Sequence, residues 1–221
     1  MARKFLSIVT VIVCAFFLCG CDSDDLSVEE CKLDMNLFDQ KYTVDDEGCC
    51  VLKGAKPVPY DEVQSKVVGY GWKSIATFEV QANGKLSRVD YYKDLIGGAP
   101  THYWFESSKQ MVRYYYVDAL PADGFSRVSW SYDATKGFFL FGDGKSPIED
   151  RYEQILKLDE SNGKTLMYTM SKYGVKSDGK GGYEPFYAMV VYRRMTDDEL
   201  KKTQETYTYD FSKKSSTSDK R

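Results

Sequence analysis

Apolar and polar residues alternate with a period of two along most of the chain between Trp72 and Met195. Such alternation is typical of β-strands that bury one face and expose the other. In the clearest case Val128, Trp130 and Tyr132 fall on one face, and Arg127, Ser129 and Ser131 fall on the other. Nine such runs follow one another: Trp72–Val80, Leu86–Asp94, Thr101–Glu106, Met111–Val117, Phe125–Tyr132, Phe138–Phe141, Tyr152–Leu158, Thr165–Tyr173 and Phe186–Met195.

The connections between these runs are short. Asn83-Gly84 and Asn162-Gly163 suit two-residue hairpin turns, and strands joined by tight turns pair antiparallel. Such a meander packs as a sandwich or closes into a barrel, and closure removes exposed strand edges. We therefore expect an all-β fold: an antiparallel up-and-down barrel of about eight strands over residues 59–195.

A short helix is expected at each end of this barrel. Tyr60, Val63 and Val67 lie on one helical face after Pro59. Thr196 and Glu199 have the spacing of a capping box, which begins a helix. We expect residues 196–221 to form this C-terminal helix and then a disordered tail.

The first twenty residues have the pattern of an export signal. Arg3 and Lys4 precede an apolar run from Phe5 to Leu18, which is too short for a spanning helix of ~20 residues. The run ends in Leu18-Cys19-Gly20-Cys21, which resembles the lipobox of bacterial lipoproteins. The resemblance implies cleavage after residue 20 and a lipid on Cys21. The alternative is an uncleaved anchor helix, which also places the domain at a membrane.

An acidic cluster, Asp22-Ser23-Asp24-Asp25, follows directly. It resembles the signal that sends some Gram-negative lipoproteins to the outer face of the outer membrane. The resemblance implies a lipid anchor in the outer membrane and exposure at the cell surface. The alternative is a plain hydrophilic linker, with the domain on the periplasmic face. Residues 21–58 are weakly periodic, and we interpret them as a tether and lead-in.

Three cysteines remain in the predicted mature domain: Cys31, Cys49 and Cys50. Outside the cytoplasm, one disulfide from Cys31 to either Cys49 or Cys50 is expected. A zinc site is not, because the thiols lack paired spacing and the sole histidine, His102, is remote in sequence. We expect no metal and no other cofactor.

Composition fits a strand-rich domain and excludes one class of partner. The chain has 18 Tyr, 12 Phe and 3 Trp, and aromatic residues favour strands. Its net charge is −3, and removing Arg3 and Lys4 with the leader makes this −5. Nucleic-acid binding needs clustered Lys and Arg, so we expect no nucleic-acid partner.

Three features together resemble the lipocalin-like domains of bacterial lipoproteins. A short helix leads into Gly69-Tyr70-Gly71-Trp72, a meander of aromatic-rich strands follows, and the last strand ends in Arg193 and Arg194. The resemblance implies that Trp72 packs under Arg193 or Arg194 and closes the barrel floor, a cation–π contact of ~0.5–2 kcal/mol. The resemblance spans about residues 60–195. It implies the fold more than it implies a ligand.

Catalytic patterns are not found. Around His102 no nucleophile has a recognisable spacing, and we expect a structural role for this residue. Gly163-Lys164-Thr165 lacks the upstream glycine of a phosphate loop, because that position is Leu158. The acidic pairs lie beside turns or a helix start. We therefore expect a protein that is not an enzyme.

Two functions remain. The first is a binding barrel for a small apolar or aromatic ligand, since alternation should turn rings and thioethers inward. The residues expected to line its cavity are Phe78, Tyr91, Tyr115, Trp130, Tyr168 and Met170. The alternative is a filled, structural barrel that presents outward aromatics to a protein or glycan partner: Tyr92, Tyr114 and Tyr116.

Overall fold

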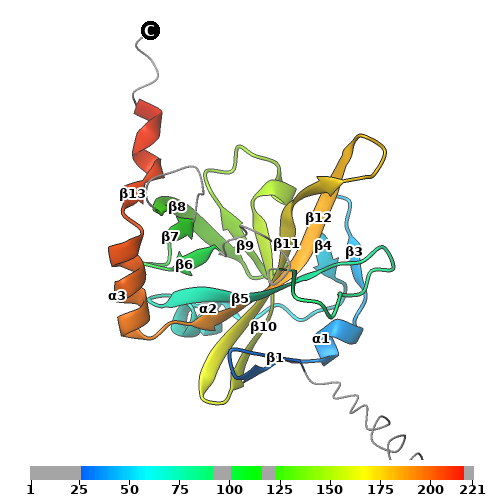
Figure 1. Ribbon diagram of the computed structural model, residues 1–221, viewed down its shortest axis with the longest axis horizontal. Helices are drawn as coiled ribbons and strands as arrows, with labels where there is room; N and C mark the ends of the chain where they lie inside the picture. The colour runs from blue at the N-terminus through cyan, green and yellow to red at the C-terminus, as the bar shows by residue number, and fades with distance from the viewer. Residues whose placement is uncertain (1–25, 92–100, 116–122, 217–221) are drawn as a thin grey trace, which may run out of the picture.

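Eight antiparallel strands close into an up-and-down barrel, which confirms the predicted fold class. The computed structural model describes residues 26–91, 101–115 and 123–216 (Figure 1). The barrel strands are β5 (Gly71–Glu79), β6 (His102–Trp104), β7 (Gln110–Tyr115), β8 (Gly124–Asp133), β9 (Phe138–Phe141), β10 (Tyr152–Ser161), β11 (Lys164–Ser177) and β12 (Tyr183–Arg194). Each pairs with the next, and β12 pairs back onto β5 to close the barrel.

The two Asn-Gly turns behave differently. Asn162 and Gly163 both have positive φ and join β10 to β11 as a tight hairpin, as predicted. Asn83-Gly84 also makes a turn, but it is flanked by a single bridge between Val80 and Leu86. The predicted strand Leu86–Asp94 is therefore wrong over residues 86–91.

A loop takes the place of this missing strand at the edge of β5. The backbone N–H of Thr77 donates to the carboxylate of Asp90 at 3.1 Å, and the N–H of Ser87 donates to the carbonyl of Glu79 at 2.8 Å. These side-chain and irregular bonds satisfy the edge of β5 without a regular ladder. Residues 92–94 lie outside the described residues.

One end of the barrel, which we call the base, is closed by helix α2 (Tyr60–Lys66). Val63 and Val67 are fully buried, and the indole of Trp72 donates to the carbonyl of Val67 at 3.3 Å. Helix α3 (Asp197–Thr206) follows β12 and begins with the predicted capping box between Thr196 and Glu199. The opposite end of the barrel we call the mouth; the 3-10 helix η2 (Ile148–Asp150) lies there, between β9 and β10.

Residues 26–58, which we call the N-terminal layer, pack against the outside of the barrel. The layer contains β1 (Ser27–Val28), β2 (Cys31–Lys32), α1 (Asn36–Asp39), β3 (Tyr42–Val44) and β4 (Cys50–Leu52). Its buried side chains are Cys31, Leu33, Leu37, Phe38, Tyr42 and Cys50, which share a core with residues of β5, β10, β11 and β12. The predicted tether over 21–58 is therefore wrong for 26–58.

The C-terminal segment also extends beyond the expected helix. Strand β13 (Tyr209–Asp210) pairs in parallel with β8, and the 3-10 helix η3 (Phe211–Ser216) follows. Gly124 is required at this junction, because a Cβ there would collide with the ring of Phe211. The predicted disordered tail is therefore ordered as far as residue 216, and residues 217–221 lie outside the described residues. Among the described residues, no helix combines the length and hydropathy needed to cross a bilayer.

Candidate ligand-binding site

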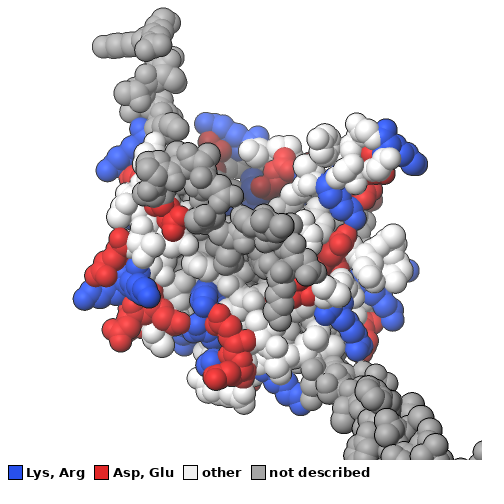
Figure 2. Space-filling view, in the orientation of Figure 1, with Lys and Arg blue, Asp and Glu red and all other residues white. Residues whose placement is uncertain are grey.

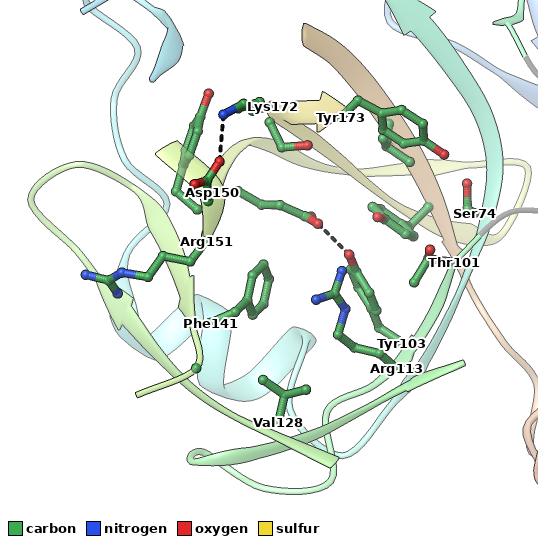
Figure 3. A pocket seen from close by; sticks show the side chains of 16 residues that line it. Ser74, Thr101, Tyr103, Arg113, Val128, Phe141, Asp150, Arg151, Lys172 and Tyr173 are labelled. Carbon is green, nitrogen blue, oxygen red and sulfur yellow. Dashed lines mark hydrogen bonds and ion pairs between the residues drawn. The ribbon is translucent and has the colours of Figure 1, made fainter. Parts of the chain in front are cut away.

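A cavity of about 380 Å³ occupies the mouth half of the barrel (Figure 3). This volume lies within the range of small-molecule sites. All eight barrel strands contribute inward-facing residues to its lining, among them Ser74, Tyr103, Arg113, Val128, Phe141, Glu153, Ser171, Tyr173, Val190 and Tyr192. The lining is mixed: four rings and several polar groups face the same space.

The base half of the barrel is filled. Trp72, Phe105, Met111, Trp130, Phe139, Ile155 and Met167 pack there into one buried cluster with α2. The rings of Phe105, Trp130 and Phe139 meet with centroids 5.0–5.4 Å apart. The barrel is thus solid at one end and hollow at the other, and the upper surface of this cluster is the floor of the cavity.

A buried carboxyl lies on the cavity wall. The hydroxyl of Tyr103 donates to Oε1 of Glu153 at 2.5 Å, and Oε2 of Glu153 has no hydrogen-bond partner. Burial raises the pKa of Glu153 above its ordinary value, against the opposing effects of the Tyr103 hydrogen bond, the charge of Arg113 and the nearby hydroxyl of Thr169. Glu153 is therefore held nearer to its neutral form than a surface glutamate.

Arg113 projects into the cavity beside this carboxyl (Figure 3). Its guanidinium carbon lies 5.8, 5.4 and 5.7 Å from the ring centres of Tyr103, Tyr115 and Phe141. These rings attract the cation and exclude water from it. The Nε atom is buried without a hydrogen-bond partner. Arginine stays charged in proteins, so a permanent cation with unused donors faces the cavity.

The charged residues at the rim of the cavity have partners outside the cavity or at the rim itself. Lys172 pairs with Asp150 at 2.6 Å, and the Nε of Arg151 donates outward to the carbonyl of Ser146 at 3.1 Å. On the face shown in Figure 2, Lys and Arg are interspersed with Asp and Glu. Among the described residues, the charged side chains that line the cavity inside this rim are Arg113 and Glu153.

Three of the predicted ligand-binding residues point out of the barrel. Phe78, Tyr168 and Met170 are buried under the N-terminal layer, on the opposite face of β5 and β11 from the cavity. Phe78, for example, meets the ring of Phe38 with centroids 4.8 Å apart. The prediction was wrong because the layer gives these strands a second apolar face, so hydrophobicity does not identify the inside.

The other three predicted residues lie inside or at the mouth. Trp130 belongs to the filled base half. The ring of Tyr91 meets that of Phe186 at 4.7 Å, at the mouth end of β12. Tyr115 flanks Arg113 and is thus the one predicted ligand residue that touches the charged part of the site.

Arg113, Tyr103 and Glu153 were not predicted, although the sequence carries a signal for two of them. Arg113 is the one charged residue of the run Met111–Val117, and Glu153 is a charged residue of the run Tyr152–Leu158, which also contains Gln154 and Lys157. Such residues are rarely buried without a partner or a function. Arg113 lies two residues after Met111, and Glu153 lies two residues before Ile155. Residues two apart in a strand face the same side, so both charged side chains point into the barrel, as Met111 and Ile155 do.

The barrel floor has the contact that the resemblance implied. The guanidinium carbon of Arg194 lies 5.6 Å from the ring centre of Trp72 and 3.9 Å from that of Tyr70. Arg194 also donates to the carbonyl of Lys66 at 2.6 Å. Arg193 points to the outside of β12, where it binds Glu199 and Glu29.

The expected disulfide is absent, and Cys31, Cys49 and Cys50 are free and buried. Adjacent residues of a strand face opposite sides, so Cys50 enters the core under the N-terminal layer while Cys49 packs with Phe138 and Tyr152. Cys31 lies in a different hairpin, β1–β2, beside the β10–β11 turn. Cys31 and Cys50 thus share one core, Cys49 lies in another, and none of the three is bonded to a second cysteine.

His102 has structural surroundings as well. Its Nδ1 accepts from the backbone N–H of Ser74 at 3.3 Å, and its ring meets that of Tyr207 at 6.3 Å. Burial, with the nearby charge of Lys73, lowers the pKa of His102 to about 4. Within the described ranges, no three His, Cys, Asp or Glu side chains are grouped as metal ligands would be.

The predicted lipidation site, Cys21, and the signal peptide lie outside the described residues, as do Tyr92 and Tyr116. Tyr114, predicted as an outward aromatic, does face away from the cavity but is only 2% exposed, because Tyr207 after α3 covers it at 5.4 Å between ring centres. No protein-family model, curated protein or solved structure matches this chain.

Proposed function

We propose that this chain is a membrane-anchored lipoprotein whose barrel binds a small polar ligand in its mouth half. The observation that carries the proposal is the division of the barrel: rings fill the base half, while the mouth half is hollow and contains Arg113 and Glu153 with unused hydrogen-bonding atoms. Buried polar groups without partners destabilise a fold, so their retention in a cavity favours a ligand that completes them.

The lining changes the ligand class that the sequence favoured. An apolar ligand would leave Arg113 and Glu153 without partners and would remove water from both. Ser74 of β5 and Ser171 of β11 add polar surface to the lining. The site is better suited to a polar molecule with a flat or ring-shaped part that lies against Tyr103, Phe141 and Tyr192.

The anchor and the location are part of the same proposal. Cys21 would carry the lipid, and the acidic cluster after it would direct the protein to the outer membrane and the cell surface. Two or more acyl chains hold a protein stably, because each buried CH₂ contributes ~0.8 kcal/mol. Labelling cells with a fatty-acid analogue tests this step. Cys21→Ala should abolish incorporation and release the protein from membranes, whereas Cys49→Ala should do neither.

Ligand binding is tested with the full chain in lipid nanodiscs, by thermal shift against polar and apolar metabolites. Ser171→Phe places a ring in the cavity, and Ser129→Phe places the same ring on the exposed face of β8 as a matched control. We expect polar compounds to stabilise the wild type and Ser129→Phe but not Ser171→Phe. Stabilisation by apolar compounds alone, or no stabilisation by any compound, would contradict the proposal.

A filled barrel that presents surface aromatics is supported less well. Tyr114 is covered. Of the large apolar side chains exposed among the described residues, two come from the paired strands β11 and β12 and the others from separate segments: Val175 and Tyr183, and Val44, Tyr60, Tyr70 and Val89. Scattered exposed apolar residues are normal for monomeric proteins.

A further inference from the structure

We propose that the ligand is a small organic anion whose carboxylate pairs with Arg113, and that Glu153 opposes this anion unless it carries a proton. The inference rests on the proposed function and names the chemistry of its ligand. It depends on the charges inside the cavity, on the rings around Arg113 and on the position of Glu153.

The first step is the charge that the cavity leaves uncompensated. Lys172 and Asp150 neutralise each other at the rim, and Arg151 is directed outward. Within the described residues, no carboxylate lies within the 4.0 Å ion-pair distance of Arg113, and Glu153 acts on it only through space. With Glu153 neutral, the cavity has a net charge of one cation.

The second step is the setting of that cation. Three rings hold the guanidinium of Arg113 and reduce its contact with water. In such surroundings an ion pair is stronger than at a surface. The planar fork of donors in arginine matches a carboxylate, which can accept two parallel hydrogen bonds. The rings of Phe141 and Tyr192 line the same cavity and offer flat surfaces to the remainder of the ligand.

The third step is the role of Glu153. Its Oε1 is held by Tyr103, and its Oε2 has no partner. As a carboxylate, Glu153 repels an incoming anion; as a carboxylic acid, it offers a proton from Oε2 instead. The titratable and charged groups around it are Tyr103 of β6, Arg113 of β7, Asp150 and Arg151 near η2, Lys172 and Tyr173 of β11, and Tyr192 of β12. Burial already favours the protonated form, and a bound anion favours it further.

Anion binding should therefore take up a proton. At pH values where the ligand carboxylate is ionised, its affinity falls as the pH rises through the pKa of Glu153. Arg113 and the rim lysine stay charged throughout this range, so neither of them gives this dependence.

The test uses isothermal titration of the full chain in nanodiscs with benzoate and with uncharged benzamide, which has a similar shape. Arg113→Met should weaken benzoate binding by about tenfold or more, the factor expected for a charge-assisted hydrogen bond, and should change benzamide binding little. Glu153→Gln keeps an acceptor for Tyr103 but removes the charge. At pH values above the pKa of Glu153, where the wild-type carboxyl is charged, it should strengthen benzoate binding, and it should abolish the fall in affinity with rising pH. Lys172→Met, at the rim, serves as the matched control and should have the smaller effect.

Opposite effects of Arg113→Met and Glu153→Gln would support the inference, since a purely structural pair would lose stability in both variants without changing anion affinity in opposite directions. If benzamide or another neutral compound binds the cavity while benzoate does not, or if Arg113→Met leaves benzoate binding unchanged, the inference is wrong and the proposed function stands. If neither probe binds and the metabolite screen also finds nothing, both are wrong.

Discussion

Arg193 binds Glu199 through two parallel hydrogen bonds, from Nη1 to Oε2 at 3.0 Å and from Nη2 to Oε1 at 2.7 Å. Its Nε also donates to Glu29 of the N-terminal layer at 3.2 Å. One side chain at the end of the last barrel strand thus connects α3 to the β1–β2 turn. Because Arg193 is buried, removing either carboxylate leaves the cation with one ion-pair partner in place of two and destabilises it.

The Arg193–Glu199 pair predicts a pH-dependent contribution to stability. The hydrogen bonds from Arg193 lower the pKa of Glu199 from 4.5 to about 2. The pair therefore stabilises the fold above about pH 4.5, and this contribution is lost as the pH falls through about 2. Glu199→Gln keeps the capping box and should lower the free energy of unfolding by about 1 kcal/mol at neutral pH, a value limited by solvent screening of Glu199.

Urea unfolding at several pH values measures this difference. The difference in the free energy of unfolding between the wild type and Glu199→Gln should disappear at the lowest pH values. Glu205→Gln, an exposed position on the same helix, is the control and should match the wild type at every pH. If the difference in the free energy of unfolding stayed the same in acid, Glu199 would act through something other than its charge.

Arg194 at the floor of the barrel gives a second prediction. Arg194→Met keeps the length of the side chain but loses the charge over Trp72 and Tyr70 and the hydrogen bond to Lys66. We expect a loss of about 1–2 kcal/mol in the free energy of unfolding. Lys180→Met, in the exposed β11–β12 loop, is the control. Equal stability of the two variants would mean that the contact does not hold the base closed.

The N-terminal layer is predicted to be an integral part of the domain. Phe38→Ala should lower the free energy of unfolding by ~3–5 kcal/mol, because it leaves a cavity against Phe78. Val44→Ala, at an exposed position of the same layer, should cost far less. If Phe38→Ala were as mild as Val44→Ala in denaturant unfolding, residues 26–58 would be a tether after all.

The three buried cysteines are predicted to be thiols that react only on unfolding. Burial raises the pKa of both Cys49 and Cys50 to about 12, and the thiolate is the reactive form. Alkylation at pH 8 without reductant should leave the folded protein unmodified, and in denaturant it should label Cys31, Cys49 and Cys50. Mass spectrometry reads the result. Labelling of a single one of these cysteines in denaturant would indicate a disulfide between the other two.

The sequence predicts the closure of the barrel well, because alternation and turn chemistry act locally. The run around Trp130 has the predicted inward and outward faces, and Asn162-Gly163 makes the predicted hairpin. The strand expected at 86–94 fails over its described part because Asp90 satisfies the edge of β5 through its side chain. That long-range contact leaves no trace in the local pattern.

The candidate site was predicted poorly. When both faces of a strand are buried, hydrophobicity does not tell which face points into the barrel. In β11, Tyr168 and Met170 face outward into the shared core, while Thr169 and Ser171 face inward. The more apolar face is therefore the outer one, and reading it as the inside selected the wrong side chains. The covering residues lie more than a hundred positions earlier in the sequence, so only the fold reveals them.

The attachment of the β1–β2 turn to the base of the barrel bears on how the molecule stands above a bilayer. Lys164 and Asn162 hold the carbonyls of Glu29 and Glu30 against the β10–β11 turn, at the end opposite the cavity. If Cys21 carries the acyl chains, residues 22–25 give the anchor a reach of at most ~14 Å before the packed layer begins. The closed end would then rest near the lipid headgroups, and the opening would face outward, toward solutes arriving from the surrounding medium.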